Sequence, residues 1–243
     1  HRLDRLRRHE LGHKLRKRMM VAEFRRAGLA AYDAKDGDVA REQLERYLYH
    51  YPDDVGVLPK FAELQLAVRP LEPGNINRAI ASYRRIFRQR PEDADVFAQL
   101  SRLYEFTGNF EELGHVARRR LEVVPDDPAA TVARAKALLS QQKPDEARGV
   151  LAPLLAALEQ QSDPDRDAYV DACLLLARIE LGPGAARSGT SAVEWLDRAV
   201  AFAPESGLAR AYRSVARLQA LEEGGTAQRE AVEQAVREDL EAA

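Results

Sequence analysis

Apolar residues recur along this chain at the spacing of one face of an α-helix, in five successive windows. In each window a small or apolar residue is followed four, seven and eight positions later by further apolar side chains, and four windows end at a proline. The third window interrupts its apolar row once, where Arg120 lies seven positions after Leu113. This periodicity predicts five amphipathic helices. The windows are Ala40–Pro52, Ala79–Pro91, Leu113–Pro125, Ala147–Glu159 and Ala192–Pro204.

A second amphipathic stretch precedes each of these windows. In it a larger residue is followed four positions later by a small one, so that two antiparallel helices can approach closely. Proline ends the outgoing helix, and carboxylates such as Asp53 favour the start of the next one. No useful length of the chain alternates with period two, so the predicted fold is all-α. The pairs of larger and small residues are Phe24/Gly28, Leu58/Ala62, Phe97/Ser101, Thr131/Ala135 and Tyr169/Cys173.

This arrangement of helix pairs resembles the tetratricopeptide repeat family. The cleanest copy runs from Ala94 to Asp127 and has the family's length of 34 residues. The resemblance implies a right-handed α-solenoid of stacked antiparallel helix pairs. The residues of that copy that fall at the family's spacing are Phe97, Leu100, Ser101, Tyr104, Gly108 and Pro125.

The repeat pattern divides the chain into three parts. A basic helical extension occupies residues 1–20, five repeats occupy about 21–54, 55–93, 94–127, 128–161 and 166–204, and a helical cap or degenerate sixth repeat occupies 205–243. In that cap we expect Leu208, Ala211, Tyr212 and Val215 to form one apolar stripe. Two insertions rich in Pro and Gly, near Pro70–Asn77 and Gly182–Thr190, lie in the turns within repeats, and their role is left open.

The first 20 residues differ from the rest in charge. They hold eight basic and two acidic side chains, whereas the whole chain has a net charge of −2. Such asymmetry favours an anionic partner, either a membrane surface or a nucleic acid. Because the sequence begins at His1, a membrane-spanning segment before it is one expectation. The alternative is a plain helical lead-in, whose leucines at positions 3, 6, 11 and 15 pack on the first repeat.

One motif in this segment is typical of zinc metallopeptidases. His9 and His13 lie four residues apart, so on a helix they could bind one Zn²⁺ while Glu10 acts as a general base. However, few residues precede the motif, its neighbours are cationic, and no third ligand follows in the segment. We therefore interpret the match as a coincidence and predict no metal site, with a peptidase fragment as a remote alternative.

Other chemistry is missing from the sequence. No Gly-x-Ser-x-Gly motif occurs, and Gly182-Pro-Gly lacks the Lys and Ser or Thr of a phosphate loop. The single cysteine, Cys173, excludes an intrachain disulfide and lies on an apolar helix face, which predicts a buried structural thiol. We predict that the protein is not an enzyme and needs no cofactor.

The resemblance also implies where a partner binds. In the tetratricopeptide repeat family the first helix of each pair lines a concave groove, which suits an extended peptide or a helix. The clamp of Lys and Asn that some members use is absent, since all three asparagines lie in predicted turns. The groove residues carried over are Arg25, Leu29, Tyr32, Pro59, Glu63, Leu66, Ala98, Arg102, Glu105, Val132, Lys136, Leu139, Val170, Leu174 and Ala177.

A second basic cluster lies on the predicted second helices. Acidic residues interleave with it, so a solvated outer face is favoured over nucleic-acid binding, for which the chain has few aromatic stacking groups. Its members are Arg84, Arg85, Arg88, Arg90, Arg118, Arg119 and Arg120.

Together these patterns favour a non-catalytic scaffold that binds a protein or peptide in its groove, in the cytoplasm or at a membrane. Anionic-surface binding through residues 1–20 is the alternative, and self-association is left open.

Overall fold

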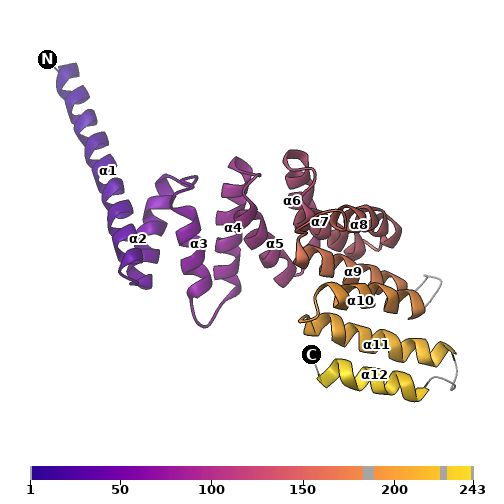
Figure 1. Ribbon diagram of the computed structural model, residues 1–243. Helices are drawn as coiled ribbons and strands as arrows, with labels where there is room; N and C mark the ends of the chain where they lie inside the picture. The colour runs from indigo at the N-terminus through magenta and orange to yellow at the C-terminus, as the bar shows by residue number, and fades with distance from the viewer. Residues whose placement is uncertain (1, 183–188, 225–228, 242–243) are drawn as a thin grey trace. The chain divides into compact units, whose positions relative to one another are not determined.

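The computed structural model describes the backbone of residues 2–182, 189–224 and 229–241, and the side chains of 11–182, 191–221 and 231–241. These residues form helices and connecting turns with no β-strand, so the all-α prediction is confirmed (Figure 1). The helices are α1 (Arg2–Asp33), α2 (Gly37–His50), α3 (Leu58–Ala67), α4 (Pro73–Gln89), α5 (Ala94–Phe106), α6 (Phe110–Val123), α7 (Pro128–Ser140), α8 (Pro144–Leu158), α9 (Arg166–Glu180), α10 (Gly189–Phe202), α11 (Gly207–Gly224) and α12 (Arg229–Glu241).

The chain forms two compact units, residues 1–108 and 109–243. The third expected repeat, 94–127, is therefore divided, since α5 lies in the first unit and α6 in the second. The insertion near Pro70–Asn77 forms the turn between α3 and α4 together with the first turn of α4. Part of the second insertion, residues 183–188, lies outside the described residues.

In the N-terminal unit each helix packs on the next one along the chain, from α1 to α5 (Figure 1). The predicted apolar row of α2 is buried, and Leu44 is completely inaccessible to solvent. Gly28 of α1 explains how the first pair comes so close. A Cβ atom at Gly28 would lie 2.5 Å from Cδ2 of Leu44, well inside van der Waals contact. The small residue of the sequence pattern therefore sits at the crossing of two helices.

The described part of α1 is longer than its partner helix, and its first half extends past α2 (Figure 1). Leu11 and Leu15 are 65% and 60% exposed, so the expectation that they pack on the first repeat is wrong. The side chains of Leu3 and Leu6 lie outside the described residues. The reason is geometric, because α2 ends at His50 and no described helix covers this side of α1.

In the C-terminal unit α9 is the central helix, and it contacts α7, α8, α10 and α11. The consecutive residues from Ala172 to Ala177 are all buried. Because consecutive residues point to all sides of a helix, this part of α9 is apolar on every face. Cys173 is 0% exposed within this cluster, which confirms the predicted buried thiol. Burial raises the pKa of this thiol to about 12. The thiol is thus a packing group.

Carboxylate side chains begin several helices, as the sequence predicted, although Asp53 does not, because α3 begins at Leu58 and its N-cap residue Val57 makes no side-chain hydrogen bond. The amide of Asn109 begins α6 in the same way. Each accepts a hydrogen bond from the backbone N–H three residues later, which satisfies one of the free donors of the first turn. The capping pairs are Asp36 with Val39, Asp93 with Val96, Asn109 with Glu112, Asp127 with Ala130 and Asp165 with Ala168.

One surface prediction is wrong in the C-terminal unit. Arg120 was expected on a solvated face, yet its side chain is 6% exposed and pairs with Asp127. The predicted stripe of α11 is open to solvent, since Leu208, Tyr212 and Val215 are 58%, 40% and 51% exposed. α11 instead buries Ala209 and Ala216, because its neighbours α9, α10 and α12 contact that other side.

Candidate functional sites

In the N-terminal unit, two of the predicted groove residues meet. The hydroxyl of Tyr32 on α1 donates a hydrogen bond to the carboxylate of Glu63 on α3, and Nζ of Lys60 lies 4.4 Å from the centre of the Tyr32 ring. This hydrogen bond and burial raise the pKa of Tyr32 to about 12. Leu29 and Leu66 are half-buried on the same two helices. The first helices of these two pairs therefore share a polar and apolar surface.

Arg25 is bound to the loop that follows α2. Its Nε donates to Oδ2 of Asp54 over 3.3 Å, and the same carboxylate accepts from the Tyr47 hydroxyl at 2.7 Å and from the Gly56 N–H at 2.8 Å. Burial alone would raise the pKa of Asp54, but these hydrogen bonds together lower it. Arg25 keeps 45% of its side chain exposed. The contact of Arg25 with Asp54 is structural, because it fixes α1 to the loop after α2.

The remaining predicted groove residues of this unit are on α3 and α5. Pro59 and Ala98 are half-buried, Arg102 is exposed and Glu105 is half-buried. These side chains are at the surface, where a ligand could reach them.

In the C-terminal unit, the predicted positions fall into two groups. Lys136 and Leu139 on α7 are half-buried, and Nζ of Lys136 lies 2.9 Å from Oδ2 of Asp171 on α9. Val132 and Ala177, in contrast, are 4% and 0% exposed, because α7 and α9 pack directly on each other. Those two positions belong to the core and present no surface to a ligand.

A hollow of about 520 Å³ lies between the start of α9 and the start of α11. Its apolar lining consists of the buried Leu174, the half-buried Val170 and the exposed Leu208, and charged side chains line the rest of its rim. Arg166 and Glu205 lie across this rim, with 3.5 Å between the guanidinium and the carboxylate. The other lining residues are Asp167, Asp171, Ala203 and Ser206.

Next to this hollow, the exposed stripe of α11 continues along the helix. Leu208, Tyr212, Val215 and Leu218 recur at helical spacing, and each has at least two-fifths of its surface accessible. The sequence predicted the stripe of Leu208, Tyr212 and Val215 in the helical cap, but not as a binding surface. The signal was nevertheless there, since Leu208, Tyr212 and Val215 follow Gly207 by one, five and eight positions, the same offsets that gave the groove residues of the five repeats.

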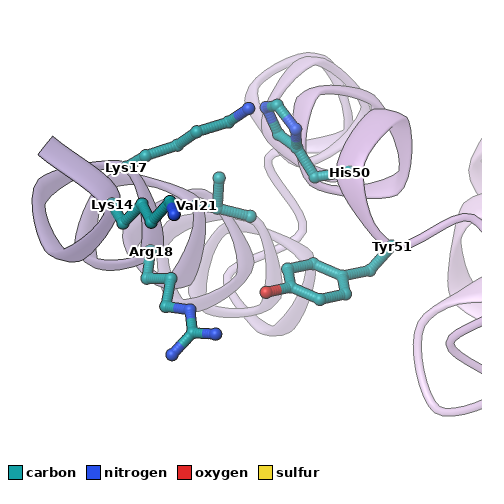
Figure 2. Close-up of a pocket in the computed structure, with 6 residues that line it drawn as sticks. All are labelled: Lys14, Lys17, Arg18, Val21, His50 and Tyr51. Atoms are coloured by element: carbon teal, nitrogen blue, oxygen red, sulfur yellow. The ribbon is translucent and has the colours of Figure 1, made fainter. Parts of the chain in front are cut away.

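A second hollow, of about 290 Å³, lies in the N-terminal unit beside the projecting half of α1. Figure 2 shows that the ammonium of Lys17 and the imidazole of His50 point toward each other across it. None of the described side chains that line it is a carboxylate. These are Lys14, Lys17, Arg18 and Val21 of α1, with His50 and Tyr51 at the end of α2 (Figure 2).

Metal chemistry gains no support from the geometry. His13 is exposed, and the side chains of His9 and Glu10 lie outside the described residues. Where side chains are described, no group of three or more His, Cys, Asp and Glu residues is arranged to hold a metal ion. Nor does any described helix have the length and apolar character needed to cross a bilayer.

Comparison with known proteins relates this chain to others by fold alone. No family model and no curated protein matches the sequence. Among solved structures, a tetratricopeptide repeat protein from Parabacteroides merdae ATCC 43184 is similar with a TM-score of 0.60 and 15% identity, over 91% of this chain and 80% of that one. The MamA protein is similar with a TM-score of 0.54 and 15% identity, over 76% and 93%.

A third similar structure is TTC0263, a thermophilic tetratricopeptide repeat protein in Thermus thermophilus. Its TM-score is 0.50 with 21% identity, over 82% of this chain and 99% of that one. These likenesses confirm the predicted fold class, a tetratricopeptide-repeat-like, all-α solenoid. At such low identity they say nothing of the ligand.

Proposed function

We propose that the protein is a non-catalytic interaction scaffold that binds an apolar segment of a partner protein on its C-terminal unit. The binding surface consists of the exposed stripe of α11 and the hollow beside it. A fold of the tetratricopeptide repeat type supports protein binding in general. The single observation that carries the proposal is the row formed by Leu208, Tyr212, Val215 and Leu218, which stays exposed although it lies in a well-packed unit.

Exposed apolar rows of this kind are costly in water and mark interaction sites on soluble proteins. Leu208 belongs both to the row and to the hollow, so the two form one surface. Val170 and Leu174 provide a floor into which an apolar side chain can insert. A peptide helix or an extended segment laid along α11 would bury these side chains together.

The rim of the hollow sets a preference in charge. Three carboxylates, Asp167, Asp171 and Glu205, line it with one guanidinium, Arg166. Lys136 already pairs with Asp171, which leaves the surplus of negative charge small. We propose that the bound segment carries a basic residue next to its apolar anchors, with the apolar contacts providing most of the affinity.

The predicted groove surface of the N-terminal unit belongs to the same proposal as a second contact area. It comprises Arg25, Leu29, Tyr32, Glu63, Leu66, Arg102 and Glu105, and in the C-terminal unit Lys136 and Leu139 extend the main surface. Tyr32 and Glu63 contact each other, so a ligand there would have to compete with their hydrogen bond.

The test is selection of peptides from a random displayed library on the whole chain, followed by titration of the selected peptides in solution. We expect apolar anchors with a neighbouring Lys or Arg. Val215→Asp should weaken binding at least tenfold, because it puts a charge in the middle of the row. Val123→Asp is the matched control, since Val123 is 42% exposed on α6 of the same unit.

Unchanged affinity in both Val215→Asp and Leu208→Asp would contradict the proposed surface. Loss of affinity in Tyr32→Ala, with none in Val215→Asp, would move the binding site to the N-terminal unit.

A second candidate function rests on a different observation in α1. Leu11, Leu15 and Met19 are spaced four apart and are 65%, 60% and 66% exposed, so they form one open apolar stripe. Exposed cations Lys14 and Arg18 lie on the adjacent face. A helix with such neighbouring stripes can lie on an anionic bilayer. Flotation with phosphatidylcholine vesicles, with and without phosphatidylglycerol, tests this function, and equal recovery with both vesicles would reject it.

A further inference from the structure

We infer that the apolar segment bound on the C-terminal unit is the projecting half of α1 from a second copy of this chain. The inference rests on the proposed function and names the partner of that same site. The site is called the α11 surface below. It consists of the row Leu208, Tyr212, Val215 and Leu218 and the hollow beside it.

The first argument is that the two apolar surfaces match in kind and in length. Leu11, Leu15 and Met19 form the α1 stripe and are 65%, 60% and 66% exposed. This stripe extends over eight positions, about 12 Å at the rise of an α-helix, and the row from Leu208 to Leu218 extends over ten, about 15 Å. Packing one helix face on the other removes both from water.

The second argument is that the two units carry opposite net charge. Residues 1–108 hold 21 Lys and Arg against 16 Asp and Glu, a net charge of +5. Residues 109–243 hold 16 against 23, a net charge of −7. Every charged residue of each unit is counted, so local ion pairs do not alter the sign. The N-terminal unit of one copy is therefore attracted to the C-terminal unit of another.

The charges beside the two surfaces have the same complementary signs. Arg18 follows Leu15 by three positions and therefore lies along the edge of the α1 stripe. Figure 2 shows that its guanidinium points away from Lys17 and His50. Arg18 is exposed, so it can contact a second chain that packs on the stripe.

On the α11 surface, one rim carboxylate is the matching acceptor. Asp171 pairs with Lys136, and Glu205 lies 3.5 Å from Arg166, so both have cations of their own unit beside them. Asp167 lines the same hollow and is exposed. We assign Asp167 as the partner of Arg18 from the second copy.

Charge also disfavours a contact between two identical surfaces. Residues 1–20 have a net charge of +6, so two α1 segments repel each other, and two C-terminal units at −7 do the same. Contact between unlike surfaces avoids both repulsions. Two copies that exchange their α1 helices close into a dimer, and copies that add head to tail continue into a chain.

The experiment measures the mass of the whole chain by sedimentation velocity over a range of concentrations. The wild type should associate as its concentration rises. Leu15→Asp and Val215→Asp should each weaken this association at least about tenfold, because each puts a charge in the middle of one apolar surface. An equimolar mixture of the two variants should form a one-to-one heterodimer, since each supplies the surface that the other lacks.

Further variants test the charges and provide the controls. Arg18→Glu should weaken association about threefold, the effect expected for an exposed ion pair. Met20→Asp and Val123→Asp put the same charge at positions that are 48% and 42% exposed on α1 and α6, outside both surfaces. They should leave association unchanged. Far-UV circular dichroism of each variant checks that the helices are intact.

Other outcomes overturn the inference in distinct ways. Association that only Leu15→Asp abolishes would mean that two α1 helices pair, and association that only Val215→Asp abolishes would mean that two α11 surfaces pair. A wild type that stays monomeric while selected peptides bind the α11 surface would reject the second copy and leave the proposed function in place. A monomer that binds no selected peptide would reject both. A monomer whose flotation with anionic vesicles is lost in Leu15→Asp would assign the α1 stripe to the bilayer.

Discussion

Nε of Arg120, at the end of α6, donates a hydrogen bond of 2.7 Å to Oδ2 of Asp127, and the two side chains are only 6% and 9% exposed. The other carboxylate oxygen of Asp127 accepts from the N–H of Ala130 at 2.8 Å and thereby caps α7. The one polar residue that interrupts the apolar rows of the sequence therefore fastens the end of one helix to the start of the next.

Replacing Arg120 by methionine should strongly destabilise the C-terminal unit. The change leaves the Asp127 carboxylate buried without its guanidinium partner, at a cost of about 3–5 kcal/mol in the free energy of unfolding. Arg119→Met is the matched control, because Arg119 pairs with Glu122 at the surface and such pairs contribute about 0–0.5 kcal/mol. Urea unfolding followed by circular dichroism measures both. Similar losses in the two variants would show that the Arg120 pair has no special role.

The two glycines in the described side-chain range of α1 should respond to alanine in opposite directions. At Gly28 a methyl group would lie 2.5 Å from Cδ2 of Leu44 and 3.1 Å from its backbone nitrogen, in a fully buried contact. The overpacking should cost about 1–3 kcal/mol. At Gly12 nothing lies within 4 Å of the added atom, so alanine should stabilise the helix by up to about 1 kcal/mol. Thermal unfolding of the two variants gives the signs, and a stabilising Gly28→Ala would refute the close helix crossing.

The stability of the protein should fall at alkaline pH through Cys173. Burial raises the pKa of its thiol to about 12, whereas an unfolded chain has a thiol pKa of about 8.5. Above pH 8.5 the unfolded state releases this proton and the folded state keeps it. The unfolded state then binds fewer protons, so the free energy of unfolding decreases as pH rises. The contribution of the Cys173 thiol to the free energy of unfolding is fully present below pH 8.5 and is lost as the pH rises toward 12.

Cys173→Ala supplies the reference for that measurement. Between pH 7.5 and 10 the unfolding free energy of the wild type should decline more steeply than that of the variant, since all other titrating groups are common to both. A disulfide reagent at pH 8 should modify the thiol only in denaturant. Parallel pH profiles, or fast modification of the folded protein, would show that the thiol is accessible.

The packing of α12 on α11 should depend on the carboxylate of Asp239. Asp239 of α12 is 4% exposed and accepts hydrogen bonds from Arg213 at 2.9 Å and from Arg217 at 2.8 Å, both on α11. The bond to Asp239 raises the pKa of the Arg213 guanidinium. Asp239→Ala should therefore lower the free energy of unfolding of α12 by about 3 kcal/mol, which is the cost of breaking a buried ion pair. Glu238→Ala removes an exposed carboxylate one residue earlier and should have little effect.

Hydrogen exchange read out by peptide gives the expected pattern directly. The amides of α12 should lose protection in Asp239→Ala, while those of α9 keep theirs, because α12 is at the end of the unit. Unchanged protection of α12 would mean that its apolar contacts suffice.

The sequence was informative wherever the decisive interactions are local. An apolar side chain and the one four positions later share a helix face whatever the rest of the chain does, so burial of Leu44 and Leu48, and of Leu151 and Leu155, could be predicted. Capping by Asp93 is local for the same reason, because acceptor and donor are three residues apart. The helices, their class and the buried thiol followed from these rules.

Tertiary structure decided everything that depends on residues far apart in the chain. Leu208 and Tyr212 follow the same apolar pattern as buried rows, and only the placement of the neighbouring helices leaves them exposed. Lys17 and His50 are thirty-three positions apart, and no local rule places them in one pocket. Periodicity determines which residues share a face of a helix, because that is fixed by backbone geometry. Whether that face meets another helix, water or a ligand is fixed by packing, which only the folded chain reveals.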